Sequence, residues 1–169
     1  AAVAVEEERD LSLAYRTTQN APPPQGQGLN DLYVRFFRMA ERRIVEKTGQ
    51  GVVCYISNYS WLDGLSHTGM RERYLDAFDK VWIDCLNGDK YKTGKLTPDG
   101  QPDPSVFSTE FNREGIQVGT AIALMVRKDE HTPAKAVAFR HLWGRSKRAD
   151  LLASADNDGR GVYSQVTPQ

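Results

Sequence analysis

Asp63, Ser66 and His67 are of the residue types that hydrolases use for nucleophilic catalysis, and they fall within one short stretch. Catalytic triads are usually assembled from distant segments, whereas Asp-Gly followed by Ser or Thr is typical of a turn that leads into a helix. We therefore interpret these residues as a turn and a helix cap. A small hydrolase stays open as an alternative hypothesis. Covalent labelling of Ser60, Ser66 or Cys54 by an electrophile would support it.

The lysine-rich stretch 88–95 has the composition of a phosphate-binding loop but not its spacing. Five residues separate its glycines where the P-loop requires four, and Leu96 stands where that motif has Ser or Thr. We therefore exclude a P-loop. The stretch still supplies three candidate contacts to DNA: Lys90, Lys92 and Lys95.

Arginines and aromatic residues give further candidate DNA contacts. Arg35, Arg38 and Arg42 recur at helical spacing, where a phosphate-binding face competes with the commoner solvated helix face. Phe107 and Phe111 lie in a long polar segment, in which aromatic rings either fold back on the core or stack on a flat partner. The 22 basic and 22 acidic residues argue against a general polyanion-binding protein but permit a local basic face.

The composition predicts one globular domain without a membrane span, a secretion signal or a zinc site. The 169 residues are 40% hydrophobic, and no apolar run approaches the roughly 20 residues of a membrane helix. Cys54 and Cys85 stand in apolar runs without metal-ligand spacing, so we predict two buried, reduced thiols in a cytoplasmic protein.

Periodicity predicts an α/β fold in which parallel strands are followed by an antiparallel strand. The first helix is expected to begin at Asn30 or Asp31 and to bury a stripe of Leu32, Phe36, Ala40 and Ile44. The expected order is a helix at 31–47, a strand buried on both faces at 52–56, a helix at 70–78, a strand at 81–86, a strand at 116–127 and a short edge strand at 137–139.

Loop composition divides the chain into three parts. Three consecutive prolines and two glycines make 16–28 a loop, so 1–28 is predicted to be an N-terminal segment with a Pro/Gly loop. The α/β domain is expected at 29–145 and a linker or tail at 146–169. The turn-rich segment 87–115 is long for a compact domain, and such loops are usually functional or mobile.

Two segments, NDLYVRFFRMA at 30–40 and GVVCYISNYSWLDG at 51–64, resemble the region downstream of the catalytic NPPY motif in DNA adenine-specific methyltransferases. The resemblance is specifically to single-chain Type ISP restriction-modification enzymes, and it runs from about Tyr15 to Trp143. It implies the C-terminal half of a Rossmann-like sheet that binds S-adenosylmethionine. Residues 52–56, 81–86 and 118–126 would then be its fifth, sixth and antiparallel seventh strands.

The resemblance also implies a chemistry, which is methyl transfer to the exocyclic N6 amine of an adenine flipped out of double-stranded DNA. In that family an aromatic residue before the seventh strand packs against the base, and Phe111 is the nearest candidate, with Phe107 behind it. The sequence has no NPPY tetrapeptide, no glycine-rich cofactor loop and no acidic residue placed to hold the ribose. The resemblance therefore implies a piece of a parent methyltransferase that is inactive alone.

Two consequences and one alternative follow. The strand at 52–56 should present an unpaired edge that binds the missing N-terminal half of the methyltransferase domain or causes self-association. The alternative is a DNA-binding, target-recognition or scaffold module without catalysis. Such a module would bind DNA with an affinity that falls steeply with salt and would not respond to S-adenosylmethionine.

Overall fold

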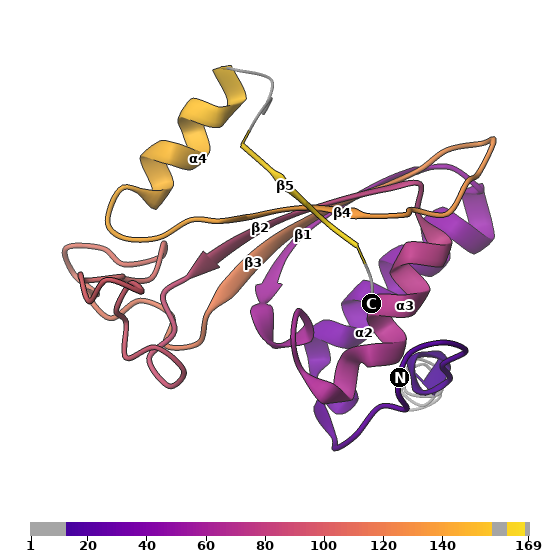
Figure 1. Cartoon of the computed structure of the whole chain (residues 1–169), viewed down its shortest axis with the longest axis horizontal. Coiled ribbons are helices and arrows are strands. Elements are labelled where there is room, and N and C mark those ends of the chain that lie inside the picture. The colour runs from indigo at the N-terminus through magenta and orange to yellow at the C-terminus, as the bar shows by residue number, and fades with distance from the viewer. Residues whose placement is uncertain (1–12, 157–161, 168–169) are drawn as a thin grey trace. The chain divides into compact units, whose positions relative to one another are not determined.

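The computed structural model describes residues 13–156 and 162–167, whose five strands form one mixed sheet in the order β1-β3-β2-β4-β5 (Figure 1). The strands are β1 Gly51–Asn58, β2 Lys80–Asn87, β3 Thr120–Arg127, β4 Val137–His141 and β5 Ser164–Val166. The expected α/β class and the strands expected at 52–56 and 81–86 are confirmed. The strand expected at 116–127 is present but begins only at Thr120.

Strand β3 lies between β1 and β2 and runs opposite to both. Three backbone hydrogen bonds show this direction: Asp79 N–H to the Val126 carbonyl, Lys90 N–H to Gln117 and Tyr59 N–H to Gly119, at 2.8, 2.7 and 3.0 Å. The beginning of β3 therefore lies beside the ends of its two neighbours. The expectation of same-direction strands followed by an antiparallel strand is confirmed.

Strand β4 continues the sheet in parallel with β2, with Ile83 opposite Phe139 and Cys85 opposite His141. Strand β5 pairs with β4 in the antiparallel sense. The prediction of an edge strand at 137–139 was therefore wrong in its position, because β5 occupies the edge. Helix α4 at Lys147–Asp156 and β5 both fall in the segment expected to be a linker or tail.

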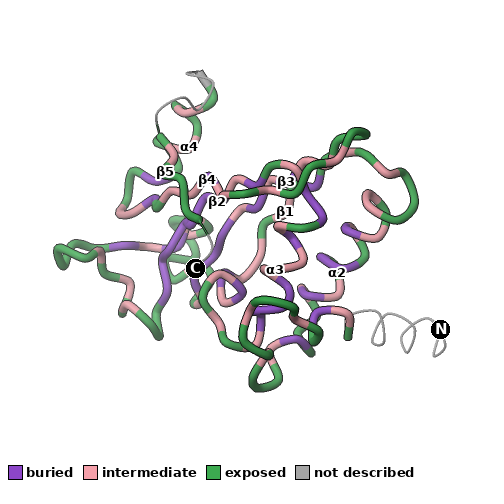
Figure 2. The backbone as a smooth tube through the Cα atoms, turned by 45° about the vertical axis from the view of Figure 1, so that its right-hand side comes forward, coloured by how far each residue is buried: buried purple, intermediate pink, exposed green. Residues whose placement is uncertain are grey.

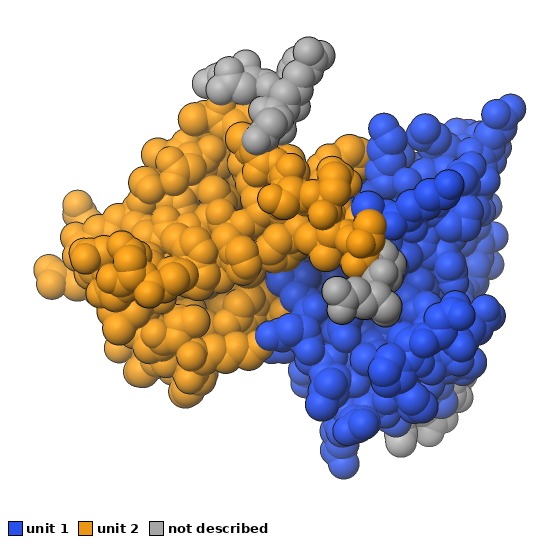
Figure 3. All heavy atoms as spheres, viewed as in Figure 1, with its two compact units in different colours: residues 1–55, 60–81, 124–136 blue, residues 56–59, 82–123, 137–169 orange. Residues whose placement is uncertain are grey.

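The chain divides into two compact units, distinguished in Figure 3. The first comprises Ala1–Tyr55, Ser60–Val81 and Leu124–Ala136, and the second Ile56–Tyr59, Trp82–Ala123 and Val137–Gln169. Residues 1–12 of the expected N-terminal segment, and 157–161 and 168–169 of the expected linker or tail, lie outside the described residues.

The described part of the first unit contains helices α2 at Leu32–Glu41 and α3 at Thr68–Ala77. Asp31 is the N-cap of α2, and the helix continues through a π-helical segment to a left-handed Gly49, with a φ of 75°. Both ends match the prediction. Gly49 supplies the left-handed residue that ends the helix, whereas Asp31 makes no side-chain cap hydrogen bond. Helix α3 buries Met70 and Tyr74, as expected.

The face that α2 buries differs from the expected one (Figure 2). Leu32 is 63% exposed and Phe36 is also exposed, whereas Phe37 and Glu41 are buried. The ring centroid of Phe37 lies 4.7 Å from that of Tyr55, so an aromatic cluster decides which side of the helix faces inward.

Strand β1 was predicted to be buried on both faces, and this was wrong. Val53 is buried, but Val52 is 57% exposed and Ile56 and Cys54 are also exposed. Successive side chains of a strand point to opposite faces of the sheet, so this pattern shows one covered and one open face along β1. Cys85 is buried as expected. Among the described residues, no helix has the length and apolarity needed to cross a membrane.

Candidate nucleic-acid interface

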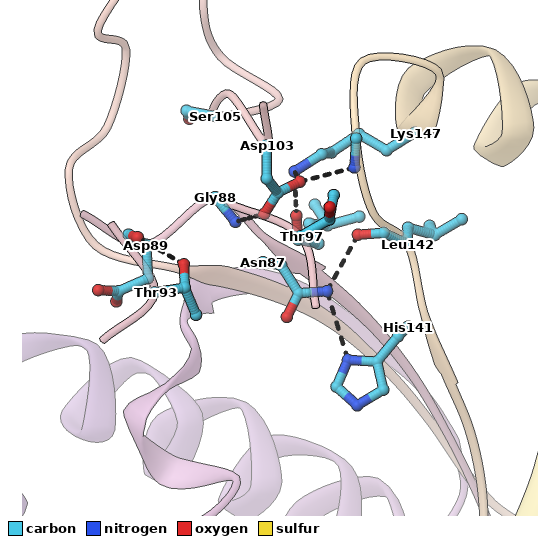
Figure 4. A network of polar contacts seen from close by, with 12 residues as sticks. Asn87, Gly88, Asp89, Thr93, Thr97, Asp103, Ser105, His141, Leu142 and Lys147 are labelled. Atoms are coloured by element: carbon cyan, nitrogen blue, oxygen red, sulfur yellow. Dashed lines mark hydrogen bonds and ion pairs between the residues drawn. The ribbon is translucent and has the colours of Figure 1, made fainter. Parts of the chain in front are cut away.

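The second unit holds a polar network at the end of β2, drawn in Figure 4. Asn87 and Gly88 adopt left-handed φ angles of 51° and 73°. The Asn87 side-chain amide donates to the Leu142 carbonyl at 3.0 Å and lies 3.3 Å from Nδ1 of His141. A Cβ atom at residue 88 would lie 3.0 Å from the Ser105 backbone, so glycine permits this close approach.

Asp89 fixes the next turn through its carboxylate. It accepts hydrogen bonds from the backbone N–H groups of Tyr91, Lys92 and Gly119, at 2.7, 2.6 and 2.8 Å. Burial alone would raise the pKa of the Asp89 carboxyl, but these donors lower it below its usual value. An ionised Asp89 therefore holds the start of the long loop against the residue that precedes β3.

A buried ion pair holds the other side of the same loop. The Asp103 carboxylate accepts from the backbone N–H groups of Gly88 and Gly144, both at 2.7 Å, and lies 2.6 Å from the Lys147 ammonium. Lys147 also donates to the Leu86 carbonyl at 2.7 Å. Burial lowers the pKa of Lys147, while Asp103 acts in the opposite direction. The Asp103 carboxylate therefore joins the long loop, the end of β2 and the start of helix α4.

The fixed loop presents Phe111 to the surface. Thr109 N–H donates to the Asn112 carbonyl at 2.9 Å, and Asn112 N–H donates to Oγ1 of Thr109 at 3.0 Å. Phe111 lies inside this turn and is 100% exposed, while Phe107 and Tyr91 are also exposed. An aromatic ring displayed on a hydrogen-bonded turn is suited to stacking on a flat partner.

The three candidate lysines lie in the same unit as Phe111, and each engages a neighbour. Lys90 lies 3.4 Å from a Glu114 carboxylate oxygen, and both side chains are exposed. Lys92 stands over the Tyr59 ring at 4.8 Å. Lys95 donates to the Glu114 backbone carbonyl. Lysine side chains near the loop favour a long-range attraction to phosphates.

The arginine stripe of α2 is partly drawn into ion pairs with neighbouring glutamates. Arg38 is only 6% exposed and pairs with Glu41 at 2.9 Å and Glu46 at 2.8 Å. Arg42 pairs with Glu46 at 3.3 Å. The Nε atom of Arg35 is buried without a hydrogen-bond partner. The buried Glu41 requires a cation, which is why Arg38 turns inward.

The hydrolase-like residues do not assemble a triad. The Ser66 hydroxyl donates to the Gln25 carbonyl, and Nε2 of His67 lies 2.9 Å from the Tyr33 hydroxyl. The Gly64 N–H donates to the Ser60 carbonyl at 2.9 Å, which closes a turn. The part of the chain that the structure describes contains no group of three His, Cys, Asp or Glu residues able to hold a metal ion.

The described residues do not fit an S-adenosylmethionine cradle. Strand β1 runs into a 3₁₀ turn, Tyr59–Trp61, rather than a glycine-rich loop, and β2 runs into the long polar loop. Gly69, at the start of α3, permits close approach of protein backbone, because a Cβ there would lie 2.1 Å from the Tyr15 carbonyl oxygen. We therefore assign no step of methyl transfer to this chain.

No family model and no curated protein matches the sequence, but solved structures resemble nearly the whole chain. The ATP-dependent Type ISP restriction-modification enzyme LlaBIII bound to DNA aligns with a TM-score of 0.70 at 20% identity, over 97% of this chain. A nuclease-deletion mutant of the Type ISP enzyme LlaGI with a DNA substrate mimic gives 0.69 at 19% over 96%, and a DrdV–DNA complex gives 0.65 at 19% over 98%.

A part of each of these structures shares its fold with this chain. The chain spans only 10% of the LlaBIII chain and 15% of each of the other two, so it corresponds to a small part of each enzyme. At this identity the likeness shows the fold alone.

Sequence reasoning missed the residues that hold the loop. Asp103 and Lys147 are 44 positions apart and stand in unremarkable polar contexts, so no local pattern connects them. Asn87, Gly88 and Asp89 stand at the start of the turn-rich segment 87–115, which the sequence indicated to be functional or mobile. The structure gives the Asn87 and Asp89 side chains their hydrogen-bond partners.

Proposed function

We propose that this chain is part of a DNA adenine methyltransferase of a restriction-modification enzyme and that its partner is double-stranded DNA. The observation that carries the proposal is the fold likeness over 96–98% of the chain to three structures solved with DNA or a DNA mimic, two of them Type ISP restriction-modification enzymes. The adenine specificity rests on the resemblance of 30–40 and 51–64 to the region downstream of NPPY.

In this proposal the long loop of the second unit contacts DNA. Phe111 stacks on a base, and Lys90, Lys92 and Lys95 contribute positive charge near the same loop. The rest of the parent enzyme supplies the NPPY motif and the residues that bind S-adenosylmethionine. This chain positions DNA and completes the sheet.

The edge strand β1 is the proposed junction with the rest of the methyltransferase sheet. It has a neighbour on only one side in the described sheet, and Val52 and Cys54 are exposed along it. In the first unit, α2 adds exposed Leu32 and Phe36. An open strand edge with exposed apolar side chains pairs readily with another strand. The isolated chain should therefore self-associate when the N-terminal half of the methyltransferase domain is absent.

The proposal is tested by comparing DNA binding with methylation. Fluorescence anisotropy with a labelled duplex should show an affinity that falls as salt rises from about 50 to 200 mM. Calorimetry should detect no binding of S-adenosylmethionine to the 169 residues, and a tritium-transfer assay no methylation of DNA. Methylation by the isolated chain would contradict this division of roles, and salt-independent or absent duplex binding would contradict DNA as the partner.

A DNA-binding or scaffold module without catalysis is the second candidate, favoured by the lack of an NPPY tetrapeptide in the sequence. The coding DNA upstream of the Ala1 codon separates the two. An in-frame NPPY motif preceded by a glycine-rich strand–loop–helix supports the methyltransferase. A stop codon there supports the module.

A further inference from the structure

A cavity of about 680 Å³ in the second unit brings together three cationic side chains from distant parts of the sequence. Lys95 and Arg113 come from the long loop, and Arg145 follows β4. Ser108 and Thr109 add hydroxyl groups to its wall. We refer to this cavity as the arginine pocket. Its cations and hydroxyls are the groups that proteins use to bind phosphate oxygens.

The two arginines have their hydrogen-bonding capacity available. Within the described ranges 13–156 and 162–167, neither the Arg113 nor the Arg145 guanidinium has a hydrogen-bond or ion-pair partner. A guanidinium presents a planar fork of donors that matches two oxygens of one phosphate. Lys95 differs, because its ammonium already donates to the Glu114 carbonyl. Lys95 therefore contributes positive charge to the pocket but not the planar set of N–H donors that an arginine offers.

An independent observation comes from Ser108. Its Oγ atom is buried and has no hydrogen-bond partner, although it lines the pocket. A buried hydroxyl without a partner carries a desolvation cost that a bound acceptor or water removes. A phosphate oxygen would be such an acceptor.

The acidic residues at the pocket do not cancel this charge. The Asp103 carboxylate is neutralised by Lys147 at 2.6 Å and is further engaged by two backbone N–H groups. That leaves Glu110 as the unpaired carboxylate on the pocket wall within the described residues, against three cations. Glu110 is exposed, so its charge is screened by solvent more than a buried one would be.

We propose that the arginine pocket binds a backbone phosphate of DNA, held by Arg113, Arg145 and the Ser108 hydroxyl. This rests on the proposed function, and it names the protein groups that the DNA backbone contacts. The pocket belongs to the same unit as Phe111, whose turn at 109–112 includes pocket residue Thr109. The phosphate contact would therefore set the position of the strand while the aromatic ring meets a base.

The first experiment measures duplex binding by anisotropy for the full chain and for Arg113→Gln, Arg145→Gln and the double variant. Each single substitution should weaken binding and reduce the magnitude of the log–log salt slope by about one. Arg43→Gln is the matched control, because Arg43 is an exposed arginine in the first unit, and it should leave affinity and slope unchanged. A double variant with wild-type affinity and slope would overturn the proposal while leaving DNA binding itself intact.

Two further variants separate binding from folding. Ser108→Ala removes an unpartnered hydroxyl, so it should leave the melting temperature unchanged or slightly raised and still weaken duplex binding. Glu110→Gln removes the opposing charge and should tighten binding. An unchanged affinity in both variants would count against a phosphate in this pocket.

The second experiment titrates inorganic phosphate into ¹⁵N-labelled protein and follows the arginine Nε–H signals by NMR. Shifts of Arg113 and Arg145 that vanish on substitution of the partner arginine support an anion site. If the wild-type chain fails to bind duplex but shows these shifts, the proposed function fails and the ligand is free phosphate rather than a DNA phosphate. If neither duplex nor phosphate is bound, the pocket proposal is overturned.

Discussion

The Asp103 carboxylate lies 2.6 Å from the Lys147 ammonium, and both side chains are buried. Because Asp103 also accepts from Gly88 and Gly144, one carboxylate joins the end of β2, the long loop and the residues that lead into α4. The contacts of this buried carboxylate thus fix the loop that carries Phe111. A long loop without regular structure can present a binding surface only if such contacts fix its base.

Substituting Lys147 by Met should therefore destabilise the fold strongly. It leaves the Asp103 charge buried without its cation, a change that typically costs about 3–5 kcal/mol. Urea denaturation measures the free energy of unfolding. Lys90→Met is the matched control, because its ion pair with Glu114 is exposed and its loss should cost less than about 1 kcal/mol. Equal losses in the two variants would show that the buried pair has no special role.

Substituting Phe111 by Ala should change DNA binding without changing stability. The ring is fully exposed, so its removal creates no cavity and the melting temperature should stay constant. If the ring stacks on a base, duplex binding should weaken by about 1–3 kcal/mol. Leu152→Ala is the control, an exposed apolar residue on α4 that is expected to leave the affinity unchanged. An unaltered affinity in the Phe111 variant would remove the proposed stacking role.

Local sequence predicted the elements well because their ends are set by neighbouring residues. Asp31 occupies the N-cap position of α2, Gly49 adopts the left-handed conformation at its end, and Met70 and Tyr74 repeat at helical spacing on α3. Apolar runs predicted the first two strands, whereas the third was predicted from residue 116 and begins at Thr120. None of these predictions needed information from a distant part of the chain.

The faces of these elements depended on distant partners and were harder to predict. Glu41 is buried because Tyr15 donates to it at 2.7 Å and because Arg38 and Arg73 surround it with positive charge. These contacts turn α2 so that Leu32 lies outward, although its spacing indicates a core position. The phosphate site that we infer also joins residues of separate segments, so lysine spacing alone could not identify it.

The Glu41 cluster gives a third prediction. Glu41→Gln should destabilise the chain by about 3–5 kcal/mol, because it removes the counter-charge of the buried Arg38. Glu46 also pairs with Arg38, but its side chain is 37% exposed, so Glu46→Gln should cost less than about 1 kcal/mol. Urea denaturation of both variants provides the comparison. A larger loss for Glu46→Gln than for Glu41→Gln would contradict this account of why α2 turns its polar residues inward.

Asp79 should make the fold sensitive to strong acid. Its carboxylate accepts from the Lys128 and Thr132 N–H groups at 2.8 and 2.7 Å and lies 3.0 Å from His131 Nδ1. Burial opposes ionisation, but His131 and these donors lower the pKa of Asp79 from 3.8 to about 2. The folded state therefore binds a proton less readily than the unfolded chain does. The resulting stability is complete above about pH 4 and is lost as the pH falls towards 2.

Asp79→Asn should be less stable than wild type at pH 5, and the difference should shrink towards pH 2. Parallel stability curves for the two proteins would refute this linkage.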